Sequence, residues 1–201
     1  MAIKLVELKQ LGKETNETIT SAKNEWISFL DFSAELYRYS TKNKVYMYAQ
    51  RPDATAVASS KTWNNRMMRW IKKGSKGIGY IVHSNNSDHV EYVFDISDTM
   101  GIKGLSGIEP HKWRMNSDDR DQSVPYLIER YHPTLETEST PTLKDAVNGY
   151  VNDYCEEIRE DGDFSNETQY LIGSENQWKE FENELSRLIA SSSAYLIGRR
   201  C

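Results

Sequence analysis

The chain has 201 residues, of which 38% are hydrophobic and 27% are charged, and its formal net charge is −5. Such a chain is long enough to bury the core of one medium-sized domain with an extension, and its composition excludes intrinsic disorder. No window approaches the roughly 18 consecutive apolar residues of a membrane helix, and the first residues lack the apolar centre of a signal peptide. Cys155 and Cys201 form no CxxC pair or disulfide framework. We therefore expect a cytoplasmic protein with free thiols and no membrane partner.

The charge is distributed unevenly along the chain. Residues 1–85 contain 14 basic and 7 acidic residues, a net charge of +7, whereas the remainder contains 11 basic and 23 acidic residues, a net charge of −12. Within residues 41–76 the only acid is Asp53, and the basic residues there are Lys42, Lys44, Arg51, Lys61, Arg66, Arg69, Lys72, Lys73 and Lys76. This asymmetry indicates a polyanionic partner for the first half.

The first half begins with polar residues 1–19, which we interpret as a flexible, loosely attached arm. A helical pattern begins at Ser21 and repeats apolar residues at three- and four-residue steps. A second helix is predicted to be capped by Ser40 or Thr41 and to end before Pro52. Residues 54–59 read as a short extended link.

A short helix is predicted next, over residues 59–70, with Trp63, Met67 and Trp70 on one face. The period then changes to that of β-structure. Residues 77–84 and 89–96 are predicted to form a hairpin, entered through the glycine-bounded turn KKGSKG. Residues 97–116 read as loop.

The second half is acidic and helical, with predicted helices in residues 117–132, 140–161 and 174–198. The sequence thus predicts an α+β fold, with helices packed on a small, mainly antiparallel sheet. We expect one domain over residues 20–116, followed by an acidic helical extension over residues 117–201. An apolar stretch runs to within three residues of the last residue, so we expect this chain to be part of a longer polypeptide.

Aromatic and basic residues alternate between positions 37 and 76. Single-stranded nucleic acid is held by aromatic platforms beside a positive groove, and each stacked base contributes ~1–3 kcal/mol. Tyr39, Tyr46 and Trp70 are the candidates for stacking, and Trp63 is the expected core anchor. The candidate phosphate-binding cations are Lys42, Lys44, Arg51, Arg66, Arg69, Lys72, Lys73 and Lys76. The residue types leave open the alternative that the tryptophans are core and the lysines form a solvated face.

Other chemistry has weaker support in the sequence. GSKGIG, residues 74–79, lacks P-loop spacing and leads into a strand instead of a helix, so no nucleotide cofactor is expected. Asp95 and Asp98 stand at a strand end, where two carboxylates can hold Mg²⁺, although capping of a turn is the simpler explanation. His83 and His89 are expected to face each other across the hairpin. The histidines, which also include His111 and His132, lack zinc-site spacing, and we predict neither a metal nor a catalytic site.

Several short motifs follow one another in a fixed order. They are YSTKN (Tyr39, Ser40, Asn43), QRPDAT (Gln50, Pro52, Ala54, Thr55), Trp63, and RWIKKGSKGI (Arg69, Ile71, Lys73, Gly74, Lys76, Gly77). With these motifs, residues 26–82 resemble the N-terminal domain of ArdC-type antirestriction proteins. EYVFDISDT, Trp113 with Met115, and the closing SSSAYLIGRRC look closer to one branch, found at the N-terminus of large helicase/methyltransferase-like proteins of conjugative elements and phages. Met68 departs from the pattern where a glycine is common, and Ser75 departs where an acid is common.

The resemblance implies single-stranded DNA binding in a bacterial mobile-element protein, with downstream helicase or methylase domains as possible partners. The HExxH half of the antirestriction proteins is absent from these residues, so its activity is not carried over. We therefore expect non-sequence-specific binding of single-stranded DNA without catalysis or cofactor. Two alternatives remain: a metal-dependent nuclease centred on Asp95 and Asp98, and a protein-interaction or DNA-mimic module that uses the acidic C-terminal helices.

Overall fold

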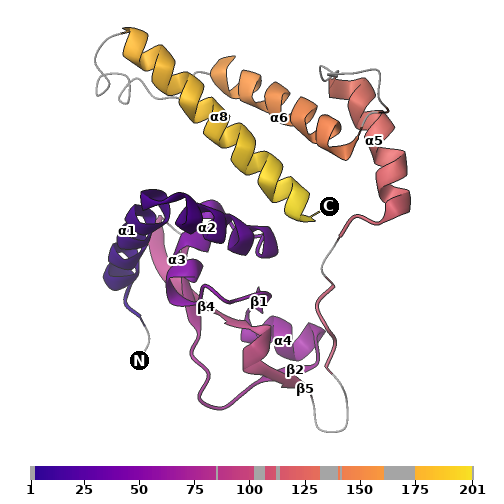
Figure 1. The fold of residues 1–201 in the computed structure, drawn as a ribbon. Helices are drawn as coiled ribbons and strands as arrows, with labels where there is room; N and C mark the ends of the chain where they lie inside the picture. The colour runs from indigo at the N-terminus through magenta and orange to yellow at the C-terminus, as the bar shows by residue number, and fades with distance from the viewer. Residues whose placement is uncertain are drawn as a thin grey trace. The chain divides into compact units, whose positions relative to one another are not determined.

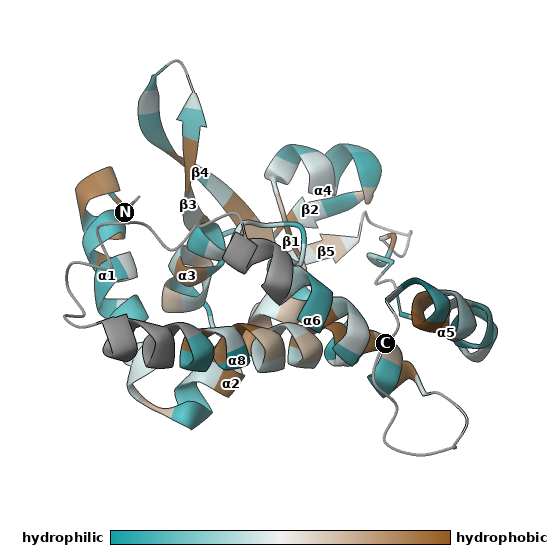
Figure 2. Ribbon diagram, turned by 90° about the horizontal axis from the view of Figure 1, so that it is seen from above, coloured by the Kyte–Doolittle hydropathy of each residue, from teal (hydrophilic) through white to brown (hydrophobic). Residues whose placement is uncertain are grey.

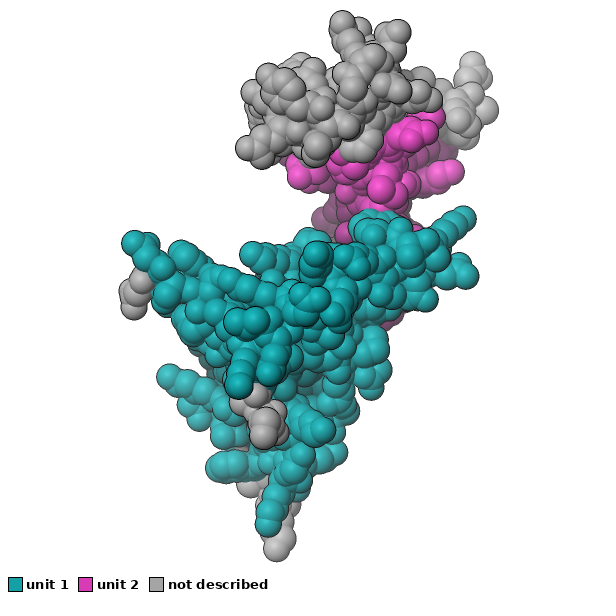
Figure 3. Space-filling model, turned by 90° about the vertical axis from the view of Figure 1, so that its left-hand side faces the viewer, with its two compact units in different colours: residues 1–112 teal, residues 113–201 magenta. Residues whose placement is uncertain are grey.

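The computed structural model describes residues 3–84, 86–101, 107–111, 114–131, 140, 142–160 and 175–200. The chain divides into two compact units, residues 1–112 and 113–201 (Figure 3). Its fold is α+β, with helices and small antiparallel sheets as the sequence predicts (Figure 1).

The N-terminal unit contains the sheets. Its elements are α1 (Leu5–Ser21), α2 (Lys23–Glu35), α3 (Thr41–Gln50), β1 (Val57–Ala58), α4 (Ser60–Arg66), β2 (Arg69–Ile71), β3 (Ile78–Ser84), β4 (Ser87–Asp95), a 3₁₀ turn (Ile96–Asp98) and β5 (Thr99–Gly101). One sheet has the strand order β1-β4-β3, and a second consists of β2 and β5.

The first helix corrects the prediction that residues 1–19 form a loose arm. Residues 5–21 form α1, in which Leu8 and Ile19 are buried in two different core clusters. Gly12 lies on the same side of the helix, and a Cβ there would come within 2.2 Å of the Tyr46 ring. The domain therefore begins at α1, because this narrow stripe of small and apolar residues packs against α3.

The next two helices follow the predicted pattern. Ser40 caps α3 as expected, since its hydroxyl oxygen accepts a hydrogen bond from the Asn43 N–H at 3.3 Å. The main core cluster joins these helices to the hairpin. Its buried members are Phe32, Leu36, Met47, Ala54, Ile78 and Val93.

The hairpin of β3 and β4 is confirmed, but its register differs in detail from the prediction. Ser84 pairs with Ser87, so β4 begins two residues earlier than expected. Figure 2 shows that the far end of this hairpin is hydrophilic and extends away from α3. His83 pairs with Asp88 and Val82 pairs with His89, which places His83 and His89 on opposite faces of the hairpin. The expectation that these two histidines face each other is therefore wrong.

The helix predicted over residues 59–70 is also shorter than expected. It ends as α4 at Arg66, and Met68 has a φ of 52°, in the left-handed region. Trp70 therefore lies on a strand, β2, and not on a helical face with Trp63. The partner strand β5 lies within the predicted loop 97–116, which is the second correction in this region.

The described part of the C-terminal unit contains α5 (Ser117–Tyr131), α6 (Leu143–Glu160) and α8 (Glu175–Arg200), close to the three predicted helices. Val147 and Val151 of α6 are buried, with Ile189 and Ile197 of α8 packed against them. None of the helices in the described part of the chain is long and apolar enough to cross a membrane.

Candidate nucleic-acid interface

The two-stranded sheet presents an exposed pair of apolar side chains. Trp70 of β2 lies directly opposite Met100 of β5, and residues paired across an antiparallel ladder share one face. Trp70 is 52% exposed and Met100 is 49% exposed. An indole left half in solvent on a short strand is available as a stacking platform. We call the strand pair β2–β5, which presents these two side chains, the tryptophan ribbon.

Arg69, next to Trp70, points to the other face of β2 and is largely covered. Its Nε donates to the Thr99 hydroxyl at 2.7 Å, and its guanidinium forms an ion pair with Glu109 at 2.8 Å. Gly107 lies against this side chain, where a Cβ would come within 2.5 Å of the Arg69 Cγ. Arg69 thus holds the ribbon to the segment after β5, which is a structural role.

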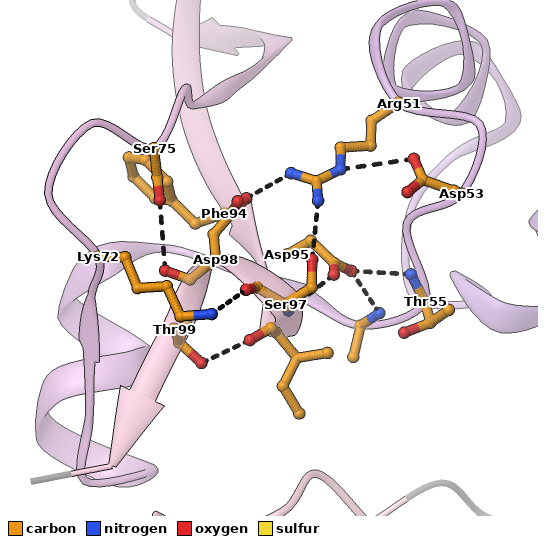
Figure 4. A network of polar contacts seen from close by, with 12 residues as sticks. Arg51, Asp53, Thr55, Lys72, Ser75, Phe94, Asp95, Ser97, Asp98 and Thr99 are labelled. Atoms are coloured by element: carbon orange, nitrogen blue, oxygen red, sulfur yellow. Dashed lines mark hydrogen bonds and ion pairs between the residues drawn. The ribbon is translucent and has the colours of Figure 1, made fainter.

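Arg51 is committed in a similar way. Its guanidinium pairs with Asp98 at 2.6 Å, lies 3.5 Å from the Asp53 carboxylate, and donates to the Ser97 hydroxyl (Figure 4). The hydrogen bond that Arg51 donates to the Asp98 carboxylate raises the pKa of Arg51 despite partial burial. This side chain therefore connects the end of α3 to the 3₁₀ turn instead of standing free for a phosphate.

The remaining predicted cations of residues 60–76 keep their charge exposed. Lys72 donates to the Ser97 carbonyl at 2.8 Å, which holds the ammonium in place without neutralising it. Arg66, Lys73 and Lys76 are exposed and form no ion pair with any residue that the structure describes. These four cations lie on either side of Trp70 in the sequence, and three of them are on the β2–β3 turn.

The two lysines of α3 differ from each other. Lys42 is exposed on the first turn of the helix, whereas Lys44 is partly buried and desolvation lowers its pKa. Both lie on α3, away in sequence from the ribbon. They stay predicted contacts of the strand.

Tyr39 and Tyr46 are not free platforms. The Tyr39 ring meets Tyr80 edge-on, with centroids 5.9 Å apart, and its hydroxyl donates to the Val57 carbonyl at 3.3 Å. Burial raises the pKa of Tyr39. Tyr46 is buried against α1. Trp63 is buried, as expected of a core anchor, and its indole N–H donates to the Phe94 carbonyl at 2.8 Å.

A groove of about 980 Å³ lies beside the β2–β3 turn. Its walls include the turn residues 74–77, the end of α3 at Gln50 and Arg51, and two rings of β4, Tyr92 and Phe94. A Cβ on Gly77 would approach the Tyr92 ring to 3.1 Å, so the glycine lets the turn pass flat against the aromatics. A single nucleic-acid strand can lie along this groove beside Lys76.

The sequence reasoning missed the roles of Tyr92 and Phe94 in this groove and of two amide side chains on α3. Gln50 exchanges two hydrogen bonds with Gly79 of β3, at 2.7 and 2.9 Å, and Asn43 does the same with Ile81, at 3.1 and 3.2 Å. Together they satisfy the open edge of β3. The alternation in HVEYVFD, residues 89–95, predicts that Tyr92 and Phe94 lie on one face of the strand. Nothing in the sequence pattern predicts the hydrogen bonds of the two amide side chains.

The two carboxylates considered for a metal site make structural contacts. Asp95 is buried, and its oxygens accept from the backbone N–H groups of Thr55, Ala56 and Ser97 at 2.8–3.0 Å. Burial opposes the charge, but these donors outweigh it and hold the pKa of Asp95 below its usual value. Asp95 thus caps the 3₁₀ turn. Among the described residues there is no cluster of three or more potential metal ligands.

Among the described histidines, His83 makes a structural contact. His83 pairs with Asp88 at 3.0 Å, and hydrogen bonds from Lys9 and His83 lower the pKa of Asp88 to about 2. The ion pair between Lys9 of α1 and Asp88 of β4 fastens the hairpin tip to α1. His132, Cys201 and the side chain of Cys155 lie outside the described residues.

Comparison with known proteins assigns no function. The chain matches no protein-family model, no curated protein and no solved structure. Any functional inference therefore rests on the geometry of the ribbon, the turn and the groove.

Proposed function

We propose that the N-terminal unit binds single-stranded DNA without sequence specificity, through the tryptophan ribbon and the β2–β3 turn, and that it has no catalysis of its own. The observation that carries this proposal is Trp70, half exposed on β2, with Arg66, Lys73 and Lys76 nearby in the sequence and in no ion pair with the described residues. A solvated face of lysines explains the cations, but it leaves an exposed indole opposite an exposed methionine unexplained.

The physical basis is the pairing of two attractions in one place. A base stacked on Trp70 contributes roughly 1–3 kcal/mol irrespective of its identity. Phosphates that approach Lys73 and Lys76 release condensed counterions, which favours binding at low salt. Because a duplex hides the faces of its bases, the stacking contribution is available only to single strands.

The direct test is fluorescence anisotropy with a labelled single strand and a duplex of the same length, on the full chain. We expect tighter binding of the single strand, and we expect Trp70→Ala to remove most of that preference. Tyr126→Ala is the matched control, because Tyr126 is 58% exposed on α5 of the other unit. Equal or tighter binding of the duplex would contradict the proposal.

A second candidate function, protein interaction, has one observation in its favour in the C-terminal unit. Tyr150 and Tyr154 are stacked on α6, with centroids 6.3 Å apart, and both are at least 40% exposed. Residues 113–201 contain 9 basic and 18 acidic residues, a net charge of −9. Exposed tyrosines among carboxylates suit a basic protein surface. A pull-down with a basic protein domain tests this function. Capture of the wild-type chain, lost when Tyr150 and Tyr154 are both changed to Ala, would support it.

A further inference from the structure

A second, smaller pocket lies in the N-terminal unit, between the end of α2, the outer edge of β1 and α4. It has a volume of about 330 Å³. The residues that matter for its chemistry are Tyr37, Arg38, Tyr39, Val57, Trp63 and His111. None of them belongs to the tryptophan ribbon or to the groove beside the β2–β3 turn. We call it the tyrosine pocket.

The edge of β1 supplies a fixed hydrogen-bond donor to this pocket. The Ile96 N–H donates to the Ala56 carbonyl at 2.9 Å, so residues 56 and 58 bond to β4 and the polar groups of Val57 point away from it. The Val57 carbonyl accepts from the Tyr39 hydroxyl, whereas its N–H has no acceptor among the described residues. This N–H is therefore available to donate to an acceptor that a ligand brings into the pocket.

The lining of the pocket combines aromatic and apolar side chains with a few polar ones. Tyr37 stands at the rim with 46% of its surface exposed, and the guanidinium of Arg38 lies 5.7 Å above its ring. Trp63 contributes only its apolar surface, since its N–H is already bonded to Phe94. These walls suit a planar ring that carries hydrogen-bond acceptors.

The charges in the pocket and the length of β1 further restrict the kinds of ligand that fit. Glu35 and Arg38 both line the pocket, and because their charges are opposite, the interior does not favour an anion. The edge of β1 is two residues long and offers a single free N–H, which is too short to pair with an added peptide strand. A neutral planar heterocycle fits both conditions.

We propose that the tyrosine pocket receives one unstacked nucleobase, with the Val57 N–H donating to an acceptor on the edge of the base and Tyr37 covering its face. This rests on the proposed function, in which the base belongs to the strand bound at Trp70. Met67 lines the pocket and precedes Trp70 by three residues, or at most about 11 Å of extended chain, so one short strand reaches both places.

The test uses probes that do not depend on the strand. The full, ¹⁵N-labelled chain is titrated with deoxynucleoside 5′-monophosphates, and with deoxyribose 5-phosphate as the probe without a base. We expect saturable shifts of the amides of Val57 and residues 37–39 with the nucleotides only. Tyr37→Ala should weaken this binding at least about fivefold, and Tyr126→Ala should leave it unchanged. Retained amide shifts elsewhere in each variant establish that it is folded.

The outcomes separate the two proposals. If nucleotides leave the Val57 amide unmoved, or if the sugar phosphate moves it equally, the pocket does not bind a base, even where anisotropy shows strand binding that depends on Trp70. If nucleotides fill the pocket but no oligonucleotide binds, the base pocket stands and the single-strand function fails. If both hold, a single abasic position in a short oligonucleotide should lower affinity in the wild type and cost nothing further in Tyr37→Ala.

Discussion

Removal of Lys73 and Lys76 from the β2–β3 turn tests the proposed interface most directly, because the expected change in salt dependence follows from the number of cations left without an ion pair. Each phosphate neutralised on a single strand contributes about −0.7 to the slope of log affinity against log salt. If all five cations of residues 66–76 each met a phosphate, the slope would be roughly −3.5. Arg69, however, is already paired with Glu109. Four unpaired cations remain, and the expected slope is therefore about −2.8.

Changing Lys73 and Lys76 together to Ala should then halve the slope, to about −1.4, and lower the affinity most at low salt. The melting temperature should hardly change, because both side chains are exposed and form no ion pair with the described residues. Anisotropy titrations with one labelled strand at several salt concentrations measure the slope. Lys13→Ala with Lys23→Ala is the matched control, since it removes the same charge from exposed positions on α1 and α2.

The control pair separates contact from general charge. If both double variants reduce the slope equally, only the net charge of the unit matters and the turn is not a contact. If the Lys73 and Lys76 change leaves affinity and slope untouched, the turn is a solvated face, and the reasoning from unpaired cations is refuted.

The remaining predictions concern Trp70, Met68, Asp95 and metal ions. Trp70→Ala should weaken binding at every salt concentration without changing the slope, since stacking releases no ions; a changed slope in the titrations would argue against stacking. Met68→Gly should raise the free energy of unfolding, measured by denaturant titration, by roughly 1 kcal/mol, because Met68 has a φ of 52° and is 41% exposed; a loss of stability would contradict this. Folding lowers the pKa of Asp95, so its contribution to stability is complete above the ordinary value of 3.8 and is lost as the pH falls through the lower folded value. Asp95→Asn should therefore be less stable at pH 7, and its melting temperature should fall less steeply than that of the wild type as the pH is lowered through this range. Incubation of single-stranded DNA with the chain and Mg²⁺ or Mn²⁺ should leave the DNA intact on a gel, and cleavage that Asp95→Asn abolishes would overturn the proposal of a non-catalytic protein.

The parts of the fold that sequence reasoning found are those with a local cause. The cap at Ser40, the hairpin and the three C-terminal helices each follow from a residue type or a period within one short segment. α1 was missed because Gly12 occupies a position in its buried stripe and leaves a gap in the apolar pattern. β5 was missed because three residues show no period, and its pairing with β2 joins residues about 30 positions apart.

The candidate site follows from the sequence in its composition but not in its detailed contacts. The sequence identified the basic segment and Trp70, since both are visible as residue types. It could not separate Arg51 and Arg69 from the free cations, because their partners Asp98 and Glu109 lie 47 and 40 residues further along the chain. The same limit applies to Tyr39, which the fold turns edge-on to Tyr80.

The residues that carry the resemblance to the antirestriction proteins fall into two groups with different physical roles. Asn43 and Gln50 satisfy the edge of β3, and Trp63 fills the core. These residues would be needed by any chain with this arrangement, whatever it binds. Lys73 and Lys76 have no such role, because their side chains form no ion pair with any residue in the described part of the chain. Likeness at the first group therefore speaks for the fold, and only likeness at the second, together with Trp70, speaks for DNA. A chain that keeps the first group and lacks the second should fold in the same way and leave single strands unbound.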